Sequence, residues 1–597
     1  MAERFDLLIR GGTVVDGTGR GPFVGDIALR QGRIAAIAPR VEGEADEVVD
    51  AKGLVVTPGF VDIHSHYDGQ ALFDDTLAPS NAHGVTTVVL GVCGIGFAPA
   101  RPADHDLLVT TMESVEDIPG DVLRAGLRWE WETFPEYLDA LGRRRFAMDV
   151  AAHIGHVALR TYVMGARGIA NEPATPEDIA AMARLAAEAV EAGALGFSTS
   201  RVKAHVTLAG DPVPGTTAKE DELFAIGRAI AQTGQPVVFQ VASAGVDGQD
   251  PEDALAEMKW MRRLSTELRI PVSFLVLQSL TAPNLWKELL DSALEAEQEG
   301  AKLRAQVANR PFGMLLGLTT RHPFLKRPTF QRLARSSGDL AALVRALRDP
   351  RNRAAILSEP DSVDTGDKYE GIGMLVVHMP TMVYPLGDDL DYEPTPDRSM
   401  DGLAKARGTT PLELFYELML EDEGRRLFLL PFFNYAGGDH ADILAMLNHP
   451  ATVLGLGDGG AHLATICDAS MPTYQLSHWV KGRTRGPRIS LERAVQMQTR
   501  DTAALYGLDD RGTLEVGKRG DVNVIDLDRL ALEPPRLVHD LPASGARLLQ
   551  NAVGYVATIV GGVVVRRNDS DTGARPGRLV RGGRPGPSAV GGASDVG

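Results

Sequence analysis

The stretch Gly59–His66 holds the residues with the clearest chemical potential in this sequence. An apolar run ends there in His64 and His66, which are separated by one residue. Side chains two apart on a strand point to the same side, so both imidazoles can share one cation. Two such histidines can also simply pack or hydrogen-bond. Their position at the end of a strand favours a metal site, because barrel enzymes place their chemistry at the carboxyl ends of their strands.

Two further residues follow strand-like runs and could join the same cation. Cys93 comes after the apolar run Thr86–Leu90, and Asp458 lies in the glycine-rich segment Gly455–His462. A thiolate beside two imidazoles favours Zn²⁺. A carboxylate at the end of the last strand can ligate the metal and accept a proton from its water. Taken singly, an inert buried thiol and an ordinary turn aspartate remain open alternatives.

The elements that must position these residues follow an alternating pattern. Between about residues 58 and 505, apolar runs alternate with helix-like stretches, which is typical of a parallel sheet. We expect an α/β fold, a (β/α)8 TIM-like barrel with helices over Pro176–Ala192, Glu222–Gln232, Pro251–Glu267 and Leu285–Glu299. The candidate strands are Gly59–His64, Thr86–Gly91, Met148–His153, Gly193–Thr199, Pro236–Val241, Pro271–Leu277, Lys302–Val307 and Thr452–Leu456.

Both chain ends have the short strands and turn glycines of a small β module. Residues 1–57 show two β runs separated by Gly11 and Gly12, and residues 506–567 include a strand over Asp521–Asp526 and a hairpin over Val556–Val565. We expect the two ends to build one β-sandwich. The gap at about 308–450 is too long for a loop and predicts an inserted lid subdomain. Residues 568–597 form a Gly/Pro/Arg-rich tail, whose last dozen residues are expected to be disordered.

Composition excludes several classes of function. The net charge of -18 would repel a phosphate backbone, so we expect no nucleic-acid partner. No apolar stretch approaches the ~20 residues that a membrane span needs, and the N-terminal segment does not have the pattern of a secretory signal. The two cysteines are expected to stay reduced in the cytoplasm. The expected partner is a small-molecule substrate, and the chain is compatible with a homo-oligomer.

These motifs together resemble the amidohydrolase superfamily, and more closely the D-aminoacylase (N-acyl-D-amino-acid deacylase) family, over nearly the whole chain. The resemblance implies that His64, His66 and Cys93 are zinc ligands. It implies that Asp458 is the general base, which takes a proton from the attacking water and delivers it to the departing amine. The implied activity is zinc-dependent hydrolysis of a C–N amide-type bond. The matching segments are Pro58–His66, Gly91–Pro99, Gly155–Arg160, Gly196–Ser200, Thr499–Gly507 and Gly512–Asp526.

The sequence departs from the family in its metal ligands. The family supplies a histidine from each of strands five and six, whereas here Gln240 stands in strand five and strand six has no histidine. We therefore prefer one zinc ion over two, held by His64, His66, Cys93 and Asp458. Gln240 could instead hydrogen-bond a substrate carbonyl or amide.

The sequence also departs from the family in its substrate-binding residues. The family binds the substrate carboxylate with basic residues after strand six and after the final aspartate, and neither segment has one here. Arg201 is a candidate replacement, and His462 could contact the substrate.

Three alternatives stay open. The substrate could be a neutral amide, carbamate, lactam or lactone, because burying a carboxylate without a cation is costly. The chain could be a metal-free, non-catalytic scaffold that kept the barrel. It could also be a deaminase of the same superfamily, although that chemistry normally uses a strand-five histidine.

Overall fold

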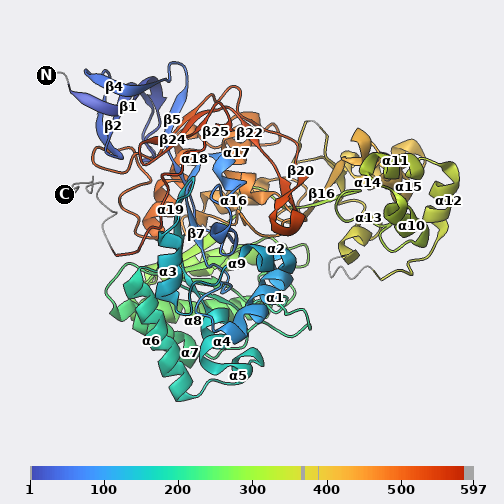
Figure 1. Cartoon of the computed structure of the whole chain (residues 1–597), viewed down its shortest axis with the longest axis horizontal. Helices are drawn as coiled ribbons and strands as arrows, with labels where there is room; N and C mark the ends of the chain where they lie inside the picture. Colours follow the sequence, from blue (N-terminus) through green and yellow to red (C-terminus); the bar gives the residue numbers. More distant parts are fainter. Residues whose placement is uncertain (1–2, 365–369, 388, 584–597) are drawn as a thin grey trace, which may run out of the picture.

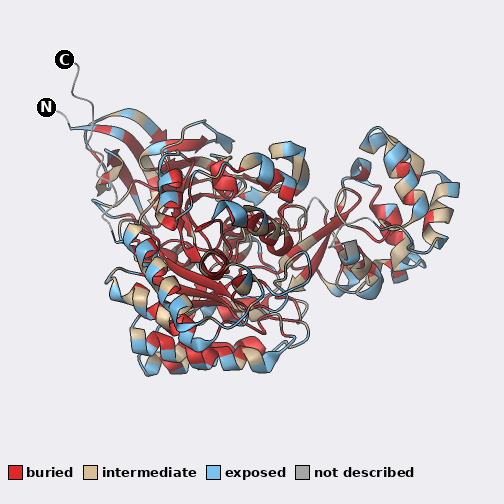
Figure 2. Cartoon of the chain, turned by 60° about the horizontal axis from the view of Figure 1, so that its bottom comes forward, coloured by how far each residue is buried: buried red, intermediate tan, exposed pale blue. Residues whose placement is uncertain are grey.

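The computed structural model describes residues 3–364, 370–387 and 389–583. Figure 1 shows a strand-rich part that contains the N-terminal strands, a body of helices around parallel strands, and a helical lobe that projects from this body. Buried residues are concentrated on the strands and on the inner sides of the helices (Figure 2). The largest apolar cluster extends through the body and includes residues from Val15 to Leu579.

Both ends of the chain contribute to one nine-stranded sheet. The connection between them is the antiparallel pair β5 and β18, in which Val56 lies opposite Val524. In this sheet, strands from the two ends of the chain are neighbours, and the expected hairpin with Gly561 and Gly562 at its turn is formed by β23 and β24. The strands are β1 (Arg4–Val14), β2 (Phe23–Arg30), β3 (Arg33–Ala38), β4 (Glu44–Asp50), β5 (Val55–Pro58), β18 (Val522–Ile525), β23 (Tyr555–Val560), β24 (Val563–Arg567) and β25 (Ser570–Asp571).

The prediction of a turn at Gly11 and Gly12 is wrong. The chain continues through both glycines as the single strand β1, and its pairing with β2 shifts register between Ile9 and Gly12. Gly11 has a φ of 67°, which fits a β-bulge with its first residue in the left-handed region. Two glycines in a strand thus mark an extra residue in one strand, and the chain does not reverse.

The body contains parallel strands in two sheets, ordered β6-β7-β8 and β17-β13-β12-β11-β10-β9. Only His153 separates β8 from β9, and a parallel bridge between Ser65 and Gly459 joins the end of β6 to the chain after β17. The expected α/β class is confirmed, and each candidate strand overlaps an observed one. The strands are β6 (Phe60–Asp62), β7 (Val85–Leu90), β8 (Asp149–Ala152), β9 (Ile154–Gly155), β10 (Gly196–Ser200), β11 (Val238–Ala242), β12 (Val272–Leu275), β13 (Leu303–Val307) and β17 (Thr452–Leu454).

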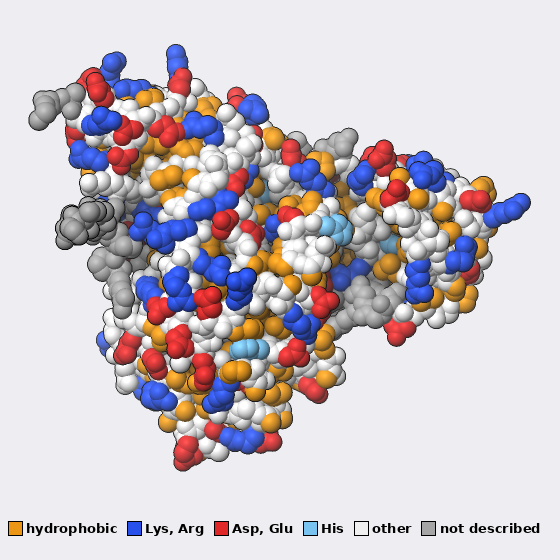
Figure 3. Space-filling view, in the orientation of Figure 1, with side chains coloured by type: hydrophobic (Ala, Val, Ile, Leu, Met, Phe, Trp, Pro, Cys, Tyr) orange, Lys and Arg blue, Asp and Glu red, His pale blue; other side chains and the backbone are white. Residues whose placement is uncertain are grey.

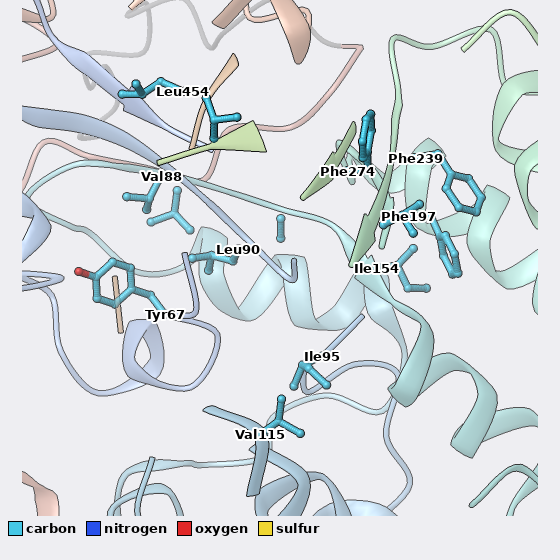
Figure 4. Packing of buried hydrophobic residues seen from close by; sticks show 14 of the residues in the cluster. Tyr67, Val88, Leu90, Ile95, Val115, Ile154, Phe197, Phe239, Phe274 and Leu454 are labelled. Atoms are coloured by element: carbon cyan, nitrogen blue, oxygen red, sulfur yellow. The ribbon is translucent and has the colours of Figure 1, made fainter. Parts of the chain in front are cut away.

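Helices cover the outer side of these strands. Figure 4 shows Phe197, Phe239 and Phe274 close together beside their strands, and the Phe239 ring lies 6.1 Å from Trp260 of α8. Because side chains alternate along a strand, the residues next to each phenylalanine in its own strand face the opposite, inner side. The helices of the body are α1 (His105–Glu116), α2 (Gly120–Gly126), α3 (Phe134–Gly142), α4 (His156–Met164), α5 (Ala166–Ile169), α6 (Pro176–Ala192), α7 (Glu220–Gln232), α8 (Pro251–Leu268), α9 (Leu285–Gln298), α16 (Ala441–Asn448), α17 (Met471–Tyr474), α18 (Leu491–Met497) and α19 (Arg500–Leu505).

The segment between β13 and α16 forms the projecting lobe of Figure 1. The lobe has its own apolar cluster, which includes Phe324, Phe415 and Phe428. It is connected to the body by the antiparallel strands β14 and β16. Its elements are β14 (Phe312–Gly317), α10 (Pro328–Ser336), α11 (Leu340–Leu347), α12 (Pro350–Ser358), α13 (Leu375–His378), β15 (Tyr384–Pro385), α14 (Met400–Arg407), α15 (Pro411–Leu418) and β16 (Leu427–Phe433).

Part of the glycine-rich tail packs against the body. Gly577 bridges to Phe146, and the amide of Val580 donates to the carbonyl of Val150 in β8 at 2.7 Å. Residues 584–597, for which composition predicts disorder, lie outside the described residues. Acidic and basic side chains are intermixed on the face shown in Figure 3. Within the described part of the chain, the structure has no helix of sufficient length and apolarity to traverse a lipid bilayer.

Candidate metal centre

Four residues from three distant segments of the chain meet at the ends of β6, β7 and β17. Nε2 of His64 lies 3.4 Å from Sγ of Cys93 and 3.3 Å from Oδ1 of Asp458. Nε2 of His66 lies 3.8 Å from the same oxygen of Asp458. The side chains of both histidines and of Cys93 are buried and offer ligand atoms within 4.8 Å of one another. The four candidate ligands therefore converge as expected.

Gln306 determines which nitrogen of His64 faces this group. Its Oε1 lies 2.6 Å from Nδ1 of His64, and its amide donates to Oγ of Ser273 at 3.0 Å. An amide oxygen can only accept, so Nδ1 carries the hydrogen. Nε2 is then left with its lone pair directed at Cys93 and Asp458, which is the tautomer a metal ligand requires.

The loops that carry two of these side chains adopt unusual backbone conformations. Cys93 has a φ of 54° and Asp458 a φ of 46°, both in the left-handed region. Non-glycine residues reach this region at a cost, and such residues cluster at functional sites. Beside Cys93, a Cβ on Gly94 would lie 2.6 Å from the backbone nitrogen of Ser200, so only glycine fits there.

Burial dominates the electrostatics of the site. It lowers the pKa of His64 to about 4 and that of His66 well below its usual value, so both rings are neutral. It raises the pKa of Asp458 to about 7. Burial, followed by the charges of Glu116 and Asp458, raises the pKa of the Cys93 thiol well above its usual value. Without a cation, the acidic groups of Asp458, Glu116 and Cys93 therefore lie close together with little positive charge beside them.

This arrangement fits a divalent cation. The ion-pair partners found for Asp458 and Glu116 among the described residues are all histidines, and burial lowers the pKa of two of them, His64 and His66. A buried set of carboxylates and a thiol without a charged partner is costly. A soft divalent ion would remove that cost, and two imidazoles, one thiolate and one carboxylate are a ligand set suited to Zn²⁺.

The residues predicted to bind substrate have different surroundings. Oε1 of Gln240 accepts a hydrogen bond from the amide of Cys93 at 2.8 Å, so this side chain supports the cysteine loop. His462 lies beside the centre, with Nε2 3.7 Å from Glu116. Nε of Arg201 lies 2.8 Å from Glu257, and a second donor lies 2.8 Å from the carbonyl of Ala218. The guanidinium of Arg201 is therefore bound to Glu257 and Ala218 and is not a substrate-binding residue of the proposed site.

Sequence reasoning missed two side chains of the site, Gln306 and Glu116. Gln306 did carry a signal, because it is a polar residue inside the apolar strand β13. Glu116 carried none, since it ends helix α1 and follows no strand.

A pocket of about 240 Å³ opens beside the centre, between the body and the lobe. Neither lysine nor arginine occurs among its described lining residues. Asp117 is the carboxylate in its wall, and Nη2 of Arg321 lies 3.1 Å from it. The lining comprises Ser114, Val115, Asp117, Ala204, His205, Met314, Ile372, His462 and Thr465.

Comparisons with known proteins identify relatives of this chain. A model of the amidohydrolase family matches residues 47–566. The chain is 28% identical to the D-aminoacylase of Alcaligenes xylosoxydans xylosoxydans, covering 97% of this chain and 98% of that protein. A solved N-acyl-D-glutamate deacylase from Bordetella bronchiseptica, in complex with zinc and a phosphonate inhibitor, matches with a TM-score of 0.63 at 21% identity, covering 97% of this chain and 100% of that chain. A D-aminoacylase with a binuclear metal centre matches with a TM-score of 0.61 at 23% identity over the same shares.

The chain therefore belongs to the amidohydrolase family. The family match confirms the resemblance inferred from the sequence, and it extends from β4 to β24. As a member of this family, the chain is a metal-dependent hydrolase that acts on carbon–nitrogen bonds other than peptide bonds.

Proposed function

We propose that this amidohydrolase uses one Zn²⁺ held by His64, His66, Cys93 and Asp458, with Asp458 as the general base. The observation that carries the proposal is the convergence of these side chains: Asp458 lies 3.3 Å from His64 and 3.8 Å from His66, and Cys93 lies 3.4 Å from His64. A second ion has less support, because Gln240 stands in strand five and its amide oxygen is engaged by Cys93.

We also propose that the two parallel sheets form a single (β/α)8 barrel. If β8 and β9 count as one strand, the pairings give eight neighbouring strands, and the bridge from Ser65 to Gly459 closes the circle. The barrel would span residues 58–505, with the lobe at about 308–450 inserted as a lid. The sandwich would take residues 1–57 and 506–567.

The chemistry assigned to each residue follows from its place. Zn²⁺, when bound, supplies Lewis acidity to the scissile carbonyl and to the attacking water. Asp458 accepts a proton from that water and delivers it to the leaving nitrogen, since its carboxylate faces the same space as the two imidazoles. Gln306 and Gln240 hold His64 and the Cys93 loop in place.

The pocket favours a substrate that is neutral near the scissile bond. No lysine or arginine occurs among the described lining residues, and the Asp117 carboxylate is paired with Arg321. A substrate carboxylate placed there would lose water without gaining a cation. We therefore favour a neutral amide, carbamate or lactam over a free N-acyl-D-amino acid, the class that the names of the relatives suggest.

Substitution of the ligands tests the metal centre. We expect His66→Ala and Asp458→Asn to abolish hydrolysis and to lower bound zinc, measured by elemental analysis of protein purified without chelator. The control is His539→Ala, because this histidine is exposed on β20 (Arg536–Leu541), with its nearest hydrogen-bond partner at 3.3 Å. Full activity in either site variant would refute the assignment, and near-zero zinc in the unaltered protein would favour the scaffold alternative.

Paired substrates test the preference for neutral compounds. Each N-acyl-D-amino acid is compared with its primary amide, in which a neutral carboxamide replaces the carboxylate. We expect a value of kcat/KM at least about tenfold higher for the amide, since ~1.4 kcal/mol of unpaid desolvation corresponds to that factor. A preference for the free acid would contradict the neutral-substrate proposal and leave the metal assignment intact.

A further inference from the structure

Glu116 is a buried carboxylate that ends helix α1 beside the candidate metal centre. Its side chain, 4% exposed, lies between two histidines. Oε1 lies 3.4 Å from Nδ1 of His66, and Oε2 lies 3.7 Å from Nε2 of His462. One carboxylate thus faces both a proposed metal ligand and a residue of the pocket wall.

The two nitrogens of His66 have different surroundings. Nε2 faces Oδ1 of Asp458, whereas Nδ1 faces Oε1 of Glu116 and makes no hydrogen bond in the described structure. A carboxylate can only accept, so a hydrogen on Nδ1 is the arrangement that satisfies this pair. Nε2 then keeps its lone pair on the side of Asp458.

The surrounding chain holds Glu116 from both sides. Its carbonyl accepts a hydrogen bond from the amide of His462 at 2.5 Å. The next residue, Asp117, ends the helix with a φ of 51° and accepts from the hydroxyl of Thr465 at 2.5 Å. Arg321, from the lobe, pairs with Asp117 at 3.1 Å. The end of α1 is therefore held in place by residues from the segment after β17 and from the lobe.

We propose that Glu116 is a positioning residue of the metal centre. It holds the hydrogen of His66 on Nδ1, so that Nε2 is directed at the ion, as Gln306 does for His64. Outer-shell carboxylates of this kind orient metal-bound histidines and increase their basicity. The same carboxylate holds His462 at the pocket wall, which couples the pocket to the metal ligand. This inference rests on the ligand set of the proposed function.

A direct metal ligand would have a different geometry. The contact from Glu116 is to Nδ1 of His66, while the contact from Asp458 is to Nε2 of the same ring. The imidazole therefore lies between the two carboxylates. Glu116 is thus placed to act through His66 and does not need to bind the ion itself.

Zinc affinity and the cobalt spectrum test the proposal in three variants of the full-length protein. Glu116→Ala removes the acceptor, and Glu116→Gln keeps an oxygen that can accept. Glu113→Ala removes a carboxylate from the same helix one turn earlier and is the matched control. Zinc affinity is measured by competition with a chelating dye. Co²⁺-loaded protein is examined for the thiolate-to-cobalt charge-transfer band and the visible ligand-field bands.

We expect Glu116→Ala to weaken zinc binding by about 10- to 100-fold, Glu116→Gln by less, and Glu113→Ala not at all. At saturating Co²⁺ the spectra of all variants should keep the shape of the unaltered protein, because the ligand set is unchanged. An altered ligand-field spectrum in Glu116→Ala would identify Glu116 as a ligand and overturn the proposal. Unchanged zinc affinity in Glu116→Ala would also overturn it while leaving the metal centre intact. Unaltered protein that binds no zinc would refute the metal centre itself.

Discussion

The proposed metal centre depends on single side chains that fix the direction of others. Gln306 has one acceptor oxygen at 2.6 Å from His64, and that contact decides which ring nitrogen keeps its lone pair. Gln240 holds the loop that carries Cys93, because its side-chain oxygen accepts a hydrogen bond from the Cys93 amide. Two amides thus stand among the inner side chains of β11 and β13, and each supports a different proposed ligand.

Replacing Gln306 tests this role. We expect Gln306→Leu to raise the dissociation constant for zinc by about 10- to 100-fold, because His64 loses the acceptor that fixes its tautomer. Gln306→Glu keeps an acceptor at this position and should lose much less. Ser273→Ala, which removes only the partner of the glutamine amide, is the control. Isothermal titration with zinc measures the effect, and equal affinity in the leucine variant would contradict it.

The residues of the site were predictable to different degrees. His64, His66, Cys93 and Asp458 could be proposed because each follows an apolar strand, and strand ends of a parallel sheet meet on one side. Glu116 could not, since its place depends on how helix α1 docks against the segment after β17. The engagement of Arg201 by Glu257 was likewise invisible, because it joins residues 56 positions apart.

Among the elements, α4 and α7 are joined by a buried charge cluster. Glu222 of α7 lies 2.8 Å from His156 and also pairs with Arg160, both on α4. These partners outweigh the effect of burial and lower the pKa of Glu222 to about 2. The helices flank β10, so this cluster helps to hold the outer layer against the parallel strands.

We expect Glu222→Gln to lower the free energy of unfolding by about 3–5 kcal/mol at pH 7, because Arg160 is left buried without a counter-charge. The pKa of Glu222 is lower in the folded state than in the unfolded state, so its stabilisation is complete above about pH 4.5. It is lost as the pH falls toward 2. Urea unfolding of both proteins from pH 7 to pH 3 should show the difference shrinking only below about 4.5. A difference that already vanishes at pH 6 would contradict this account.

The elements themselves were more predictable than their boundaries. Helix α6 begins and ends where its periodicity predicts, since Thr175 caps it and Gly193 ends it in the left-handed region. The bulge in β1 was misread as a turn, because glycine pairs serve both purposes. Register and bulges depend on the neighbouring strand, which local sequence does not contain.

At the scale of the whole molecule, the lobe and the body meet at the pocket. Arg321 of the lobe pairs with Asp117 of the body, and both side chains are largely buried. Arg321 also contacts Thr465 in the loop after β17. This group connects the lobe, the end of α1 and the loop that carries His462.

We expect Arg321→Met to lower the free energy of unfolding by about 3 kcal/mol, because the largely buried Asp117 carboxylate is left without a counter-charge. We also expect it to increase cleavage within the lobe by trypsin. The control is Arg398→Met, which removes an exposed ion pair with Asp389 within the lobe and should cost less than about 1 kcal/mol. Urea unfolding and limited proteolysis measure both effects. Equal behaviour of the two variants would show that the contact between lobe and body does not depend on this pair.

The nine-stranded sheet has a consequence for how the chain is made. Strands β1 to β5 pair with one another, but the other edge of β5, near residue 55, pairs with β18, near residue 525, so that edge has no partner until almost the whole protein has left the ribosome. Contacts between such distant residues form slowly, and unpaired strand edges are prone to aggregation in the interval. Asp458 also emerges long after His64 and His66. We therefore infer that the proposed zinc ligands come together only after β17 has been made, and that chains truncated before it lack Asp458 and the C-terminal strands of the sheet.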